Sequence, residues 1–157
     1  MRFVTMNKLF LSSALLLSIA ATGCTIETGS MDIEPTPLAG MIGGQTWTFQ
    51  AGHTSAFLSE GEDEFFATLY PTTFTPCGFS EPSGPHLIVS IPKTPGDYDM
   101  DLGRNMTFVA GDRNLVSFDG RIVVDQVTPT RVIGGLAATY DGSNEVSGTF
   151  DITICQD

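Results

Sequence analysis

The feature that most constrains this chain is a two-residue alternation of apolar and polar side chains that recurs along most of its length. In 96–102, for example, Tyr98, Met100 and Leu102 alternate with three aspartates. Successive side chains of an extended chain point to opposite faces, so this period is typical of half-buried β-strands. After Ala39 no window of about ten residues keeps the 3.6-residue period of an amphipathic helix. The sequence therefore predicts an all-β domain.

Other segments repeat this spacing and are separated by turn-forming residues. Their apolar sets are Trp47 and Phe49; Phe65, Ala67 and Leu69; Leu87, Val89 and Ile91; Met106, Phe108 and Ala110; Phe118, Ile122 and Val124; Leu136, Ala138 and Tyr140; and Val146, Phe150, Ile152 and Ile154. In 65–70 the intervening residues are also largely apolar, which predicts burial on both faces. About eight or nine short strands favour an antiparallel β-sandwich, with a small β-barrel as the alternative.

Four glycines interrupt the strand patterns at positions where a side chain would normally pack. They are Gly120, Gly134, Gly135 and Gly148. Glycine weakens a strand interior and often marks a bulge or a close approach of another backbone. We expect bulges or sharp coiling of the sheet at these positions, and the alternative is a ligand that approaches the backbone.

The first 24 residues have the composition of an export signal. Arg2 and Lys8 precede an apolar run over 9–21, which is shorter than the roughly 20 residues of a membrane span. The run ends in 21–24, Ala-Thr-Gly-Cys, which resembles the lipobox of bacterial lipoproteins. That resemblance implies removal of residues 1–23 as a signal peptide and lipidation of Cys24. Because Thr25 rather than Asp follows, it also implies sorting to the outer membrane. An ordinary signal peptide cut elsewhere is the alternative.

The remaining chain divides into a tether and one domain. Residues 24–39 are polar, contain Pro35 and Pro37 and lack strand or helix periodicity, so they are predicted to be a flexible tether. Residues 40–157 are predicted to form a single β-domain, because they are enough for one core and too few for two.

Charge limits the classes of partner. Without Arg2 and Lys8, five basic residues face 18 acidic ones, a formal charge of −13. Such a surface repels nucleic acid phosphates and anionic lipid headgroups. We therefore expect no nucleic acid partner and a membrane association that depends on the lipid at Cys24.

Two cysteines remain once Cys24 is assigned to the lipid. Cys77 and Cys155 of an exported chain are predicted to form a disulfide that closes a loop of about 79 residues. Two unpaired thiols are the alternative. A metal site lacks the usual ligand set, because no histidine lies near either cysteine in the sequence.

No motif predicts catalysis. Ser90 and Lys93 have the spacing of penicillin-recognising enzymes, but Pro92 lies between them and the companion motifs are missing. His53 and His86 are the only histidines, and no Gly-x-Ser-x-Gly nucleophile elbow accompanies them. We interpret both as ordinary loop or strand-edge residues.

Two acidic runs are the remaining polar clusters. Asp97, Asp99 and Asp101 would share one face of a strand, about 7 Å apart, which suits solvation more than one ion. Leu102 and Phe108 occupy the positions where an EF-hand requires Gly and Glu, so that motif is excluded. The second run is Glu60, Glu62, Asp63 and Glu64. We expect no metal and no cofactor at either.

The closing segment 148–155 and the order Pro95-Gly96-x-Tyr98 resemble small, uncharacterised β-rich bacterial lipoproteins. This resemblance implies the fold class and carries no activity. The sequence thus predicts a membrane-anchored, non-enzymatic binding or accessory module of the bacterial envelope. The alternatives are a lipocalin-like carrier of an apolar ligand and a hydrolase with a dispersed site.

Overall fold

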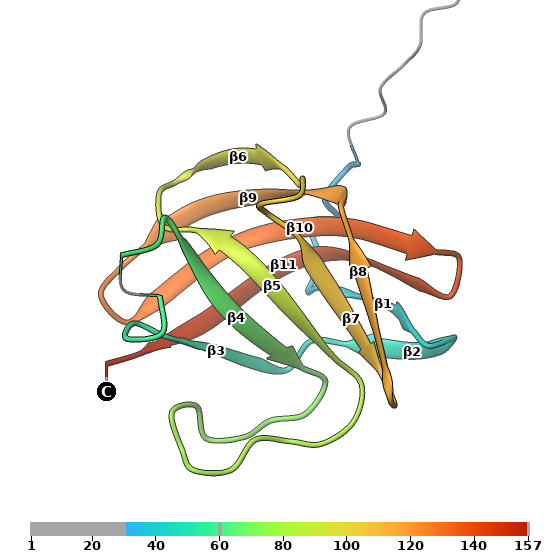
Figure 1. Cartoon of the computed structure of the whole chain (residues 1–157), viewed down its shortest axis with the longest axis horizontal. Coiled ribbons are helices and arrows are strands. Elements are labelled where there is room, and N and C mark those ends of the chain that lie inside the picture. The colour runs from blue at the N-terminus through green and yellow to red at the C-terminus, as the bar shows by residue number, and fades with distance from the viewer. Residues whose placement is uncertain (1–30, 60, 157) are drawn as a thin grey trace, which may run out of the picture.

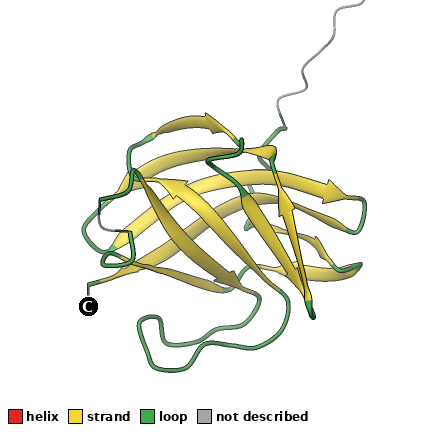
Figure 2. Ribbon diagram, in the orientation of Figure 1, coloured by secondary structure: helices red, strands yellow, loops and turns green. Residues whose placement is uncertain are grey.

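The computed structural model describes residues 31–59 and 61–156, and these residues contain strands, turns and loops but no helix (Figure 2). The strands are β1 (Ala39–Ile42), β2 (Gln45–Thr48), β3 (Ala51–Ser55), β4 (Glu64–Tyr70), β5 (His86–Pro92), β6 (Gly96–Asp99), β7 (Met106–Ala110), β8 (Arg113–Ser117), β9 (Asp119–Val127), β10 (Arg131–Asp141) and β11 (Asn144–Cys155). In this part of the chain no helix has the length and apolar character needed to cross a membrane.

All eleven strands belong to one hydrogen-bonded sheet. Its main path is β6-β9-β10-β11-β3-β4-β5-β7-β8, and the β1–β2 hairpin adds to β11. The sheet curls into a half-barrel, so that β4, β5 and β7 cross in front of β9, β10 and β11 (Figure 1). The predicted all-β class is confirmed.

The predicted antiparallel sandwich is not confirmed, because the sheet is continuous and mixed. β11 pairs in parallel with β3, through Thr153 opposite His53 and Cys155 opposite Ser55. The same edge of β11 pairs earlier with β1, through Ala39 opposite Ser147. One long strand therefore joins both halves of the sheet, where a sandwich would need two separate sheets.

The core follows the predicted alternation closely. Its fully buried side chains include Ala67, Leu69, Leu87, Val89, Ile91, Met106, Phe108, Ile122, Val132 and Leu136. The prediction that 65–70 is buried on both faces is wrong at Phe66, which is 54% exposed on the outer face of β4. Tyr70, on that same face, is buried under the loop that follows.

Three apolar residues that the alternation assigned to the core are exposed, and each lies where a strand ends or shifts. Leu102 follows the end of β6, Phe118 separates β8 from β9, and Tyr140 lies at a register shift between β10 and β11. The alternation of apolar and polar residues continues in the sequence there. The backbone is no longer a regular pleated strand, however, so alternate side chains do not all point into the core.

The packed chain begins before residue 40, which corrects the predicted tether. Leu38 is fully buried, and its N–H donates to the carbonyl of Thr149. Further upstream, Ser147 on β11 receives the N–H of Glu34 and donates to the carbonyl of Asp32. Residues 32–38 therefore lie along β11 as part of the domain. The predicted signal peptide and residues 24–30 of the predicted tether, Cys24 included, lie outside the described residues.

One of the strand glycines, Gly134, lies at a bulge, as predicted, whereas Gly148 makes a close backbone contact instead. Gly134 lies at a register shift between β9 and β10, and a Cβ there would be 2.1 Å from the carbonyl oxygen of Val123. Gly148 has a φ of +141°, and its Cβ would be 2.6 Å from the Cα of Leu38. Glycine at 148 thus lets the N-terminal segment cross β11 at close range.

We predict that Gly148→Ala lowers the free energy of unfolding by more than about 1 kcal/mol, because the new methyl group meets backbone and the φ disfavours it. The measurement is a urea unfolding curve. Gly142→Ala is the matched control, since a Cβ at Gly142 meets nothing within 4 Å, and it should change stability by less than about 0.5 kcal/mol. Equal stability of the two variants would contradict the packing of residues 32–38 on β11.

Candidate functional site

The Cys77–Cys155 disulfide is present as predicted, with the two Cα atoms 5.4 Å apart. Cys155 ends β11, and Cys77 lies in the loop 71–85 between β4 and β5, here called the strap. In the chain-entropy model a loop of this size is worth about 4 kcal/mol. The disulfide ties the strap to the last residue of β11.

The strap encloses one side of a surface groove of about 360 Å³ on the outer face of β3 and β4. The residues that line this strap groove are His53, Thr54, Ser55, Phe57, Leu58, Phe66, Thr68, Cys77, Gly78, Glu81 and Cys155. Alternation explains the floor, because His53 on β3 and Phe66 and Thr68 on β4 point away from the core. Loop and strap residues form the walls.

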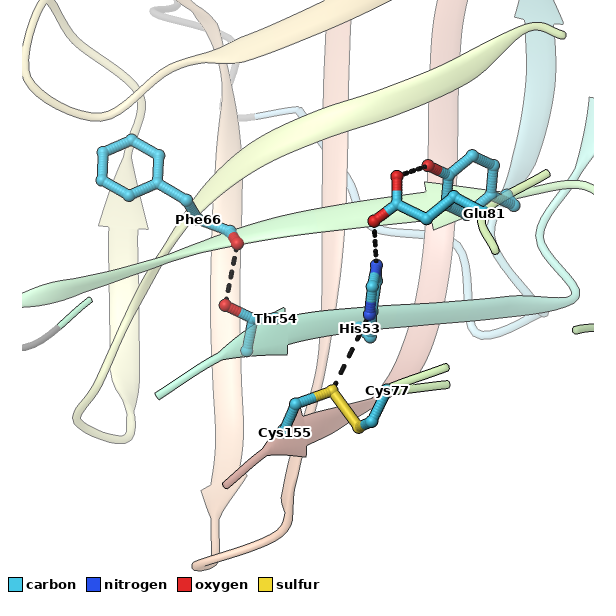
Figure 3. Close-up of polar contacts among 7 residues, drawn as sticks. His53, Thr54, Phe66, Cys77, Glu81 and Cys155 are labelled. Atoms are coloured by element: carbon cyan, nitrogen blue, oxygen red, sulfur yellow. Dashed lines mark hydrogen bonds and ion pairs between the residues drawn. A yellow bond between two sulfur atoms is a disulfide. The ribbon is translucent and has the colours of Figure 1, made fainter. Parts of the chain in front are cut away.

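His53 lies at the centre of the polar contacts in the groove, between Glu81 of the strap and the disulfide (Figure 3). Its Nε2 is 3.0 Å from Oε1 of Glu81, and its Nδ1 is 3.7 Å from Sγ of Cys155. The other oxygen of Glu81 accepts the hydroxyl of Tyr70 at 2.8 Å. The imidazole is therefore oriented on both sides, and its side chain is only 15% exposed.

Aromatic contacts hold these groups in place. The ring of Phe74 in the strap meets both His53 and Tyr70 edge to face, with centroids 5.4 and 5.2 Å apart. Burial, together with the hydrogen bond and negative charge of Glu81, raises the pKa of Tyr70 well above its usual value. Tyr70 thus remains a neutral hydroxyl that donates to Glu81.

Large apolar side chains surround the groove in solvent. Phe57 and Leu58 are 69% and 74% exposed in the loop after β3, and Phe66 is more than half exposed. Phe79, next to the groove residue Gly78, is fully exposed. Single exposed apolar residues are common, but three that line one groove, with a fourth next to a lining residue in the sequence, are typical of a binding surface.

The other histidine and the Ser-x-x-Lys pair have structural contacts. His86 Nδ1 lies 2.8 Å from the carbonyl of Gly84, and its ring packs on Tyr70. Ser90 is buried within β5, whereas Lys93 donates to the carbonyl of Ser59 and lies over the Phe65 ring.

The first acidic run does not form one carboxylate face, because β6 ends at Asp99. Asp97 is paired with Arg121 on β9, which holds the pKa of that carboxyl below its usual value. Asp101 lies in the next turn, where its Oδ1 accepts the N–H groups of Arg104 at 2.8 Å and Gly103 at 2.7 Å. These two hydrogen bonds lower the pKa of Asp101.

The second acidic run is also partly neutralised. Glu64 lies 2.7 Å from Nε of Arg104, whose guanidinium stacks over Tyr98. Burial raises the pKa of Glu64 more than Arg104 lowers it. Within residues 31–59 and 61–156, no three His, Cys, Asp or Glu side chains come together in a way that would hold a metal ion.

The chain matches no protein-family model, no curated protein and no solved structure. The site therefore rests on its own geometry.

Sequence patterns identified one part of this site and missed the rest. The disulfide was predictable from the cysteine count, but the pairing of His53 with Glu81 was not, because 27 residues of loop and strand separate them. The adjacent apolar pair Phe57 and Leu58 in an otherwise polar loop was the available signal for the groove.

We predict that Asp101→Ala lowers stability at neutral pH and that the difference from the native protein shrinks in acid. A carboxyl whose folded pKa is depressed contributes stability above its unfolded pKa, about 3.9, and loses it as pH falls through the folded value. Thermal unfolding at several pH values between neutrality and pH 2 measures this. The control is Asp99→Ala, since Asp99 contacts Arg104 through its backbone carbonyl, which the substitution keeps. A pH-independent difference for Asp101→Ala would contradict the assignment.

Proposed function

We propose that this protein is a lipid-anchored lipoprotein of the bacterial outer membrane whose β-domain binds a partner protein through the strap groove without catalysing a reaction. The observation that carries the binding role is the group of exposed apolar side chains, Phe57, Leu58, Phe66 and Phe79, around a concave site. The anchoring role is supported by residues 21–24 and the basic and apolar segment before them.

The groove suits a partner segment that carries apolar side chains and positive charge. Apolar walls offer burial of about 25 cal/mol per Å² of contact. The chain has a net charge of −11, and the exposed Glu81 carboxylate lies in the groove. Acidic surfaces favour the approach of basic partners.

The arrangement of the chain favours a protein partner over the anchoring membrane as the occupant. In Figure 1 the blue segment that begins at residue 31 leaves the sheet at the upper right, whereas the C-terminal end of β11, beside the groove, lies at the lower left. Residue 31, the described residue nearest to the proposed anchor, therefore lies away from the end of β11 that borders the groove.

Packing argues against the carrier alternative. A lipocalin-like carrier needs an apolar cavity inside the barrel, but fully buried side chains such as Leu87, Phe108 and Leu136 fill the space inside the curled sheet. A second hollow, of about 410 Å³, lies against residues 31–32 at the surface, on β1, β10 and β11. An open surface groove can accept a segment of another protein, whereas a carrier would need a closed cavity that surrounds its apolar ligand.

The hydrolase alternative has one observation in its favour, the pair His53 and Glu81, which supplies a base and a group that orients it. A triad also requires a hydroxyl or thiol nucleophile on the other imidazole nitrogen. In this site that nitrogen, Nδ1, faces the Sγ of Cys155, which is committed to the disulfide. The geometry therefore favours binding over hydrolysis.

We predict that a photocrosslinking residue at Phe66 or Phe79 captures a discrete partner in intact cell envelopes. The capture should be lost when Phe57 and Leu58 are replaced by Ser, because the apolar wall is removed. Phe118 is the matched control position, since it is 46% exposed but lies outside the groove lining. Equal capture from Phe118, or no capture from either groove position, would contradict the proposed binding surface.

We predict that Cys24→Ser abolishes labelling by a palmitate analogue and moves the protein from the membrane fraction to the soluble fraction. Lipidation requires the Cys24 thiol. The domain is acidic, so we expect no electrostatic binding to anionic lipids that would keep the protein at the membrane without its lipid. Thr25→Ser serves as the control, because it changes a neighbouring residue and keeps the thiol. Unchanged labelling of Cys24→Ser would refute the proposed anchor.

A further inference from the structure

We propose that the Cys77–Cys155 disulfide is a thiol–disulfide exchange site, in which an incoming thiolate attacks Sγ of Cys77 and Cys155 leaves as a thiolate beside His53. This goes beyond the binding role and does not depend on it. Two observations carry it: Cys77 is an exposed residue and Cys155 a buried one, and the imidazole of His53 contacts the sulfur of Cys155.

The asymmetry of the two cysteines sets the direction of attack. Cys77 is exposed in the strap, whereas Cys155 at the end of β11 is only 4% exposed. Both line the strap groove, so a thiol that enters the groove reaches Cys77 from solvent. Cys77 also has a φ of +64°, a conformation that non-glycine residues seldom adopt and that release of the strap would relieve.

His53 is placed to stabilise the sulfur that leaves. Its Nε2 faces the Glu81 carboxylate, which accepts that N–H, so a second proton would lie on Nδ1 and point at Sγ of Cys155. A carboxylate opposite the ring stabilises the positive charge that this proton brings. A thiolate beside an imidazolium is a better leaving group, which speeds exchange.

Few other ionisable groups adjoin this imidazole. Tyr70 on β4 reaches it only through Glu81, to which it donates its hydroxyl, and His86 on β5 packs on the far ring of Tyr70. The strap contributes Glu81 and the uncharged Phe74. The immediate polar partners of the His53 ring are therefore Glu81 and the disulfide.

The reaction balances as a two-electron exchange with a dithiol. The two thiols of the dithiol first lose their protons to solvent. The first thiolate forms a bond to Sγ of Cys77, the Cys77–Cys155 bond breaks, and its electron pair leaves on Cys155 as a thiolate beside His53, to which the Nδ1 proton then passes. The second thiolate attacks the dithiol's own sulfur in the mixed disulfide, and Cys77 leaves as a thiolate that takes a proton from solvent, while His53 regains its proton from solvent. The dithiol is oxidised to a disulfide, the protein is reduced to two thiols, and the strap is freed from β11.

The first test is the position of the mixed disulfide. The folded, mature protein is treated with reduced glutathione while N-ethylmaleimide is added at short intervals, and peptides are mapped by mass spectrometry. We expect glutathione on Cys77 and the maleimide on Cys155. Glutathione on Cys155 or an even distribution would overturn the proposal, because the direction of attack would be wrong. No reaction without denaturant would also overturn it, because the disulfide would then be only structural.

The second test is the dependence of the exchange rate on His53. We expect His53→Gln to slow the reaction of the glutathione thiolate by about tenfold near neutral pH, because the proton donor beside the leaving sulfur is removed. His86→Gln is the matched control and should leave the rate unchanged, because His86 contacts Tyr70 and not the disulfide.

Glu81→Gln provides a second variant that does not disturb the core, since this side chain is about half exposed. It replaces the carboxylate that contacts Nε2 of His53 with a neutral amide, so the exchange rate should fall. If both His53→Gln and Glu81→Gln react at the native rate, or faster, the role of His53 is refuted.

Discussion

The structure depends on the pairing of its last strand. β11 is bonded along one edge to β10 and along the other to β1 and then β3, so a single strand connects segments from both ends of the described chain. Hydrogen bonds from β11 also hold residues 32–38 against the domain. The parallel pairing of β11 with β3 makes the sheet mixed instead of antiparallel. Gly40 and Gly148 are points where the backbones of β11 and the N-terminal segment approach closely enough to exclude a side chain. Loss of β11 pairing would therefore separate the two halves of the core.

The candidate site follows from where β11 ends. Its parallel pairing with β3 brings Cys155 opposite Ser55, within reach of the strap that follows β4. The disulfide then holds the strap over the outer face of β3 and β4, which creates the groove and brings Glu81 to His53. The same cross-link thus forms a wall of the proposed binding surface and the centre of the proposed exchange chemistry.

Local pattern predicted the fold class well and the strand limits less well. The buried sets on β4, β7 and β11 follow the two-residue period because both edges of each strand are paired, which keeps the strand extended with one face toward the core. Leu102, Phe118 and Tyr140 keep the period but are exposed, since periodicity in a sequence does not indicate where hydrogen bonding stops. Residues 32–38 were assigned to a tether for a related reason: they have no period of their own, and their order comes from contacts with β11.

The sequence by itself determined the all-β class, the inward residues of most strands and the Cys77–Cys155 pair, because alternation and cysteine count act through local geometry and simple chemistry. Only the tertiary structure decided the curled mixed sheet, the strap groove and the placement of His53 between Glu81 and a disulfide sulfur. The physical reason is that these features depend on pairings between segments far apart in the chain. Such pairings are selected by the shape and register of the whole sheet and leave no signal in any single window.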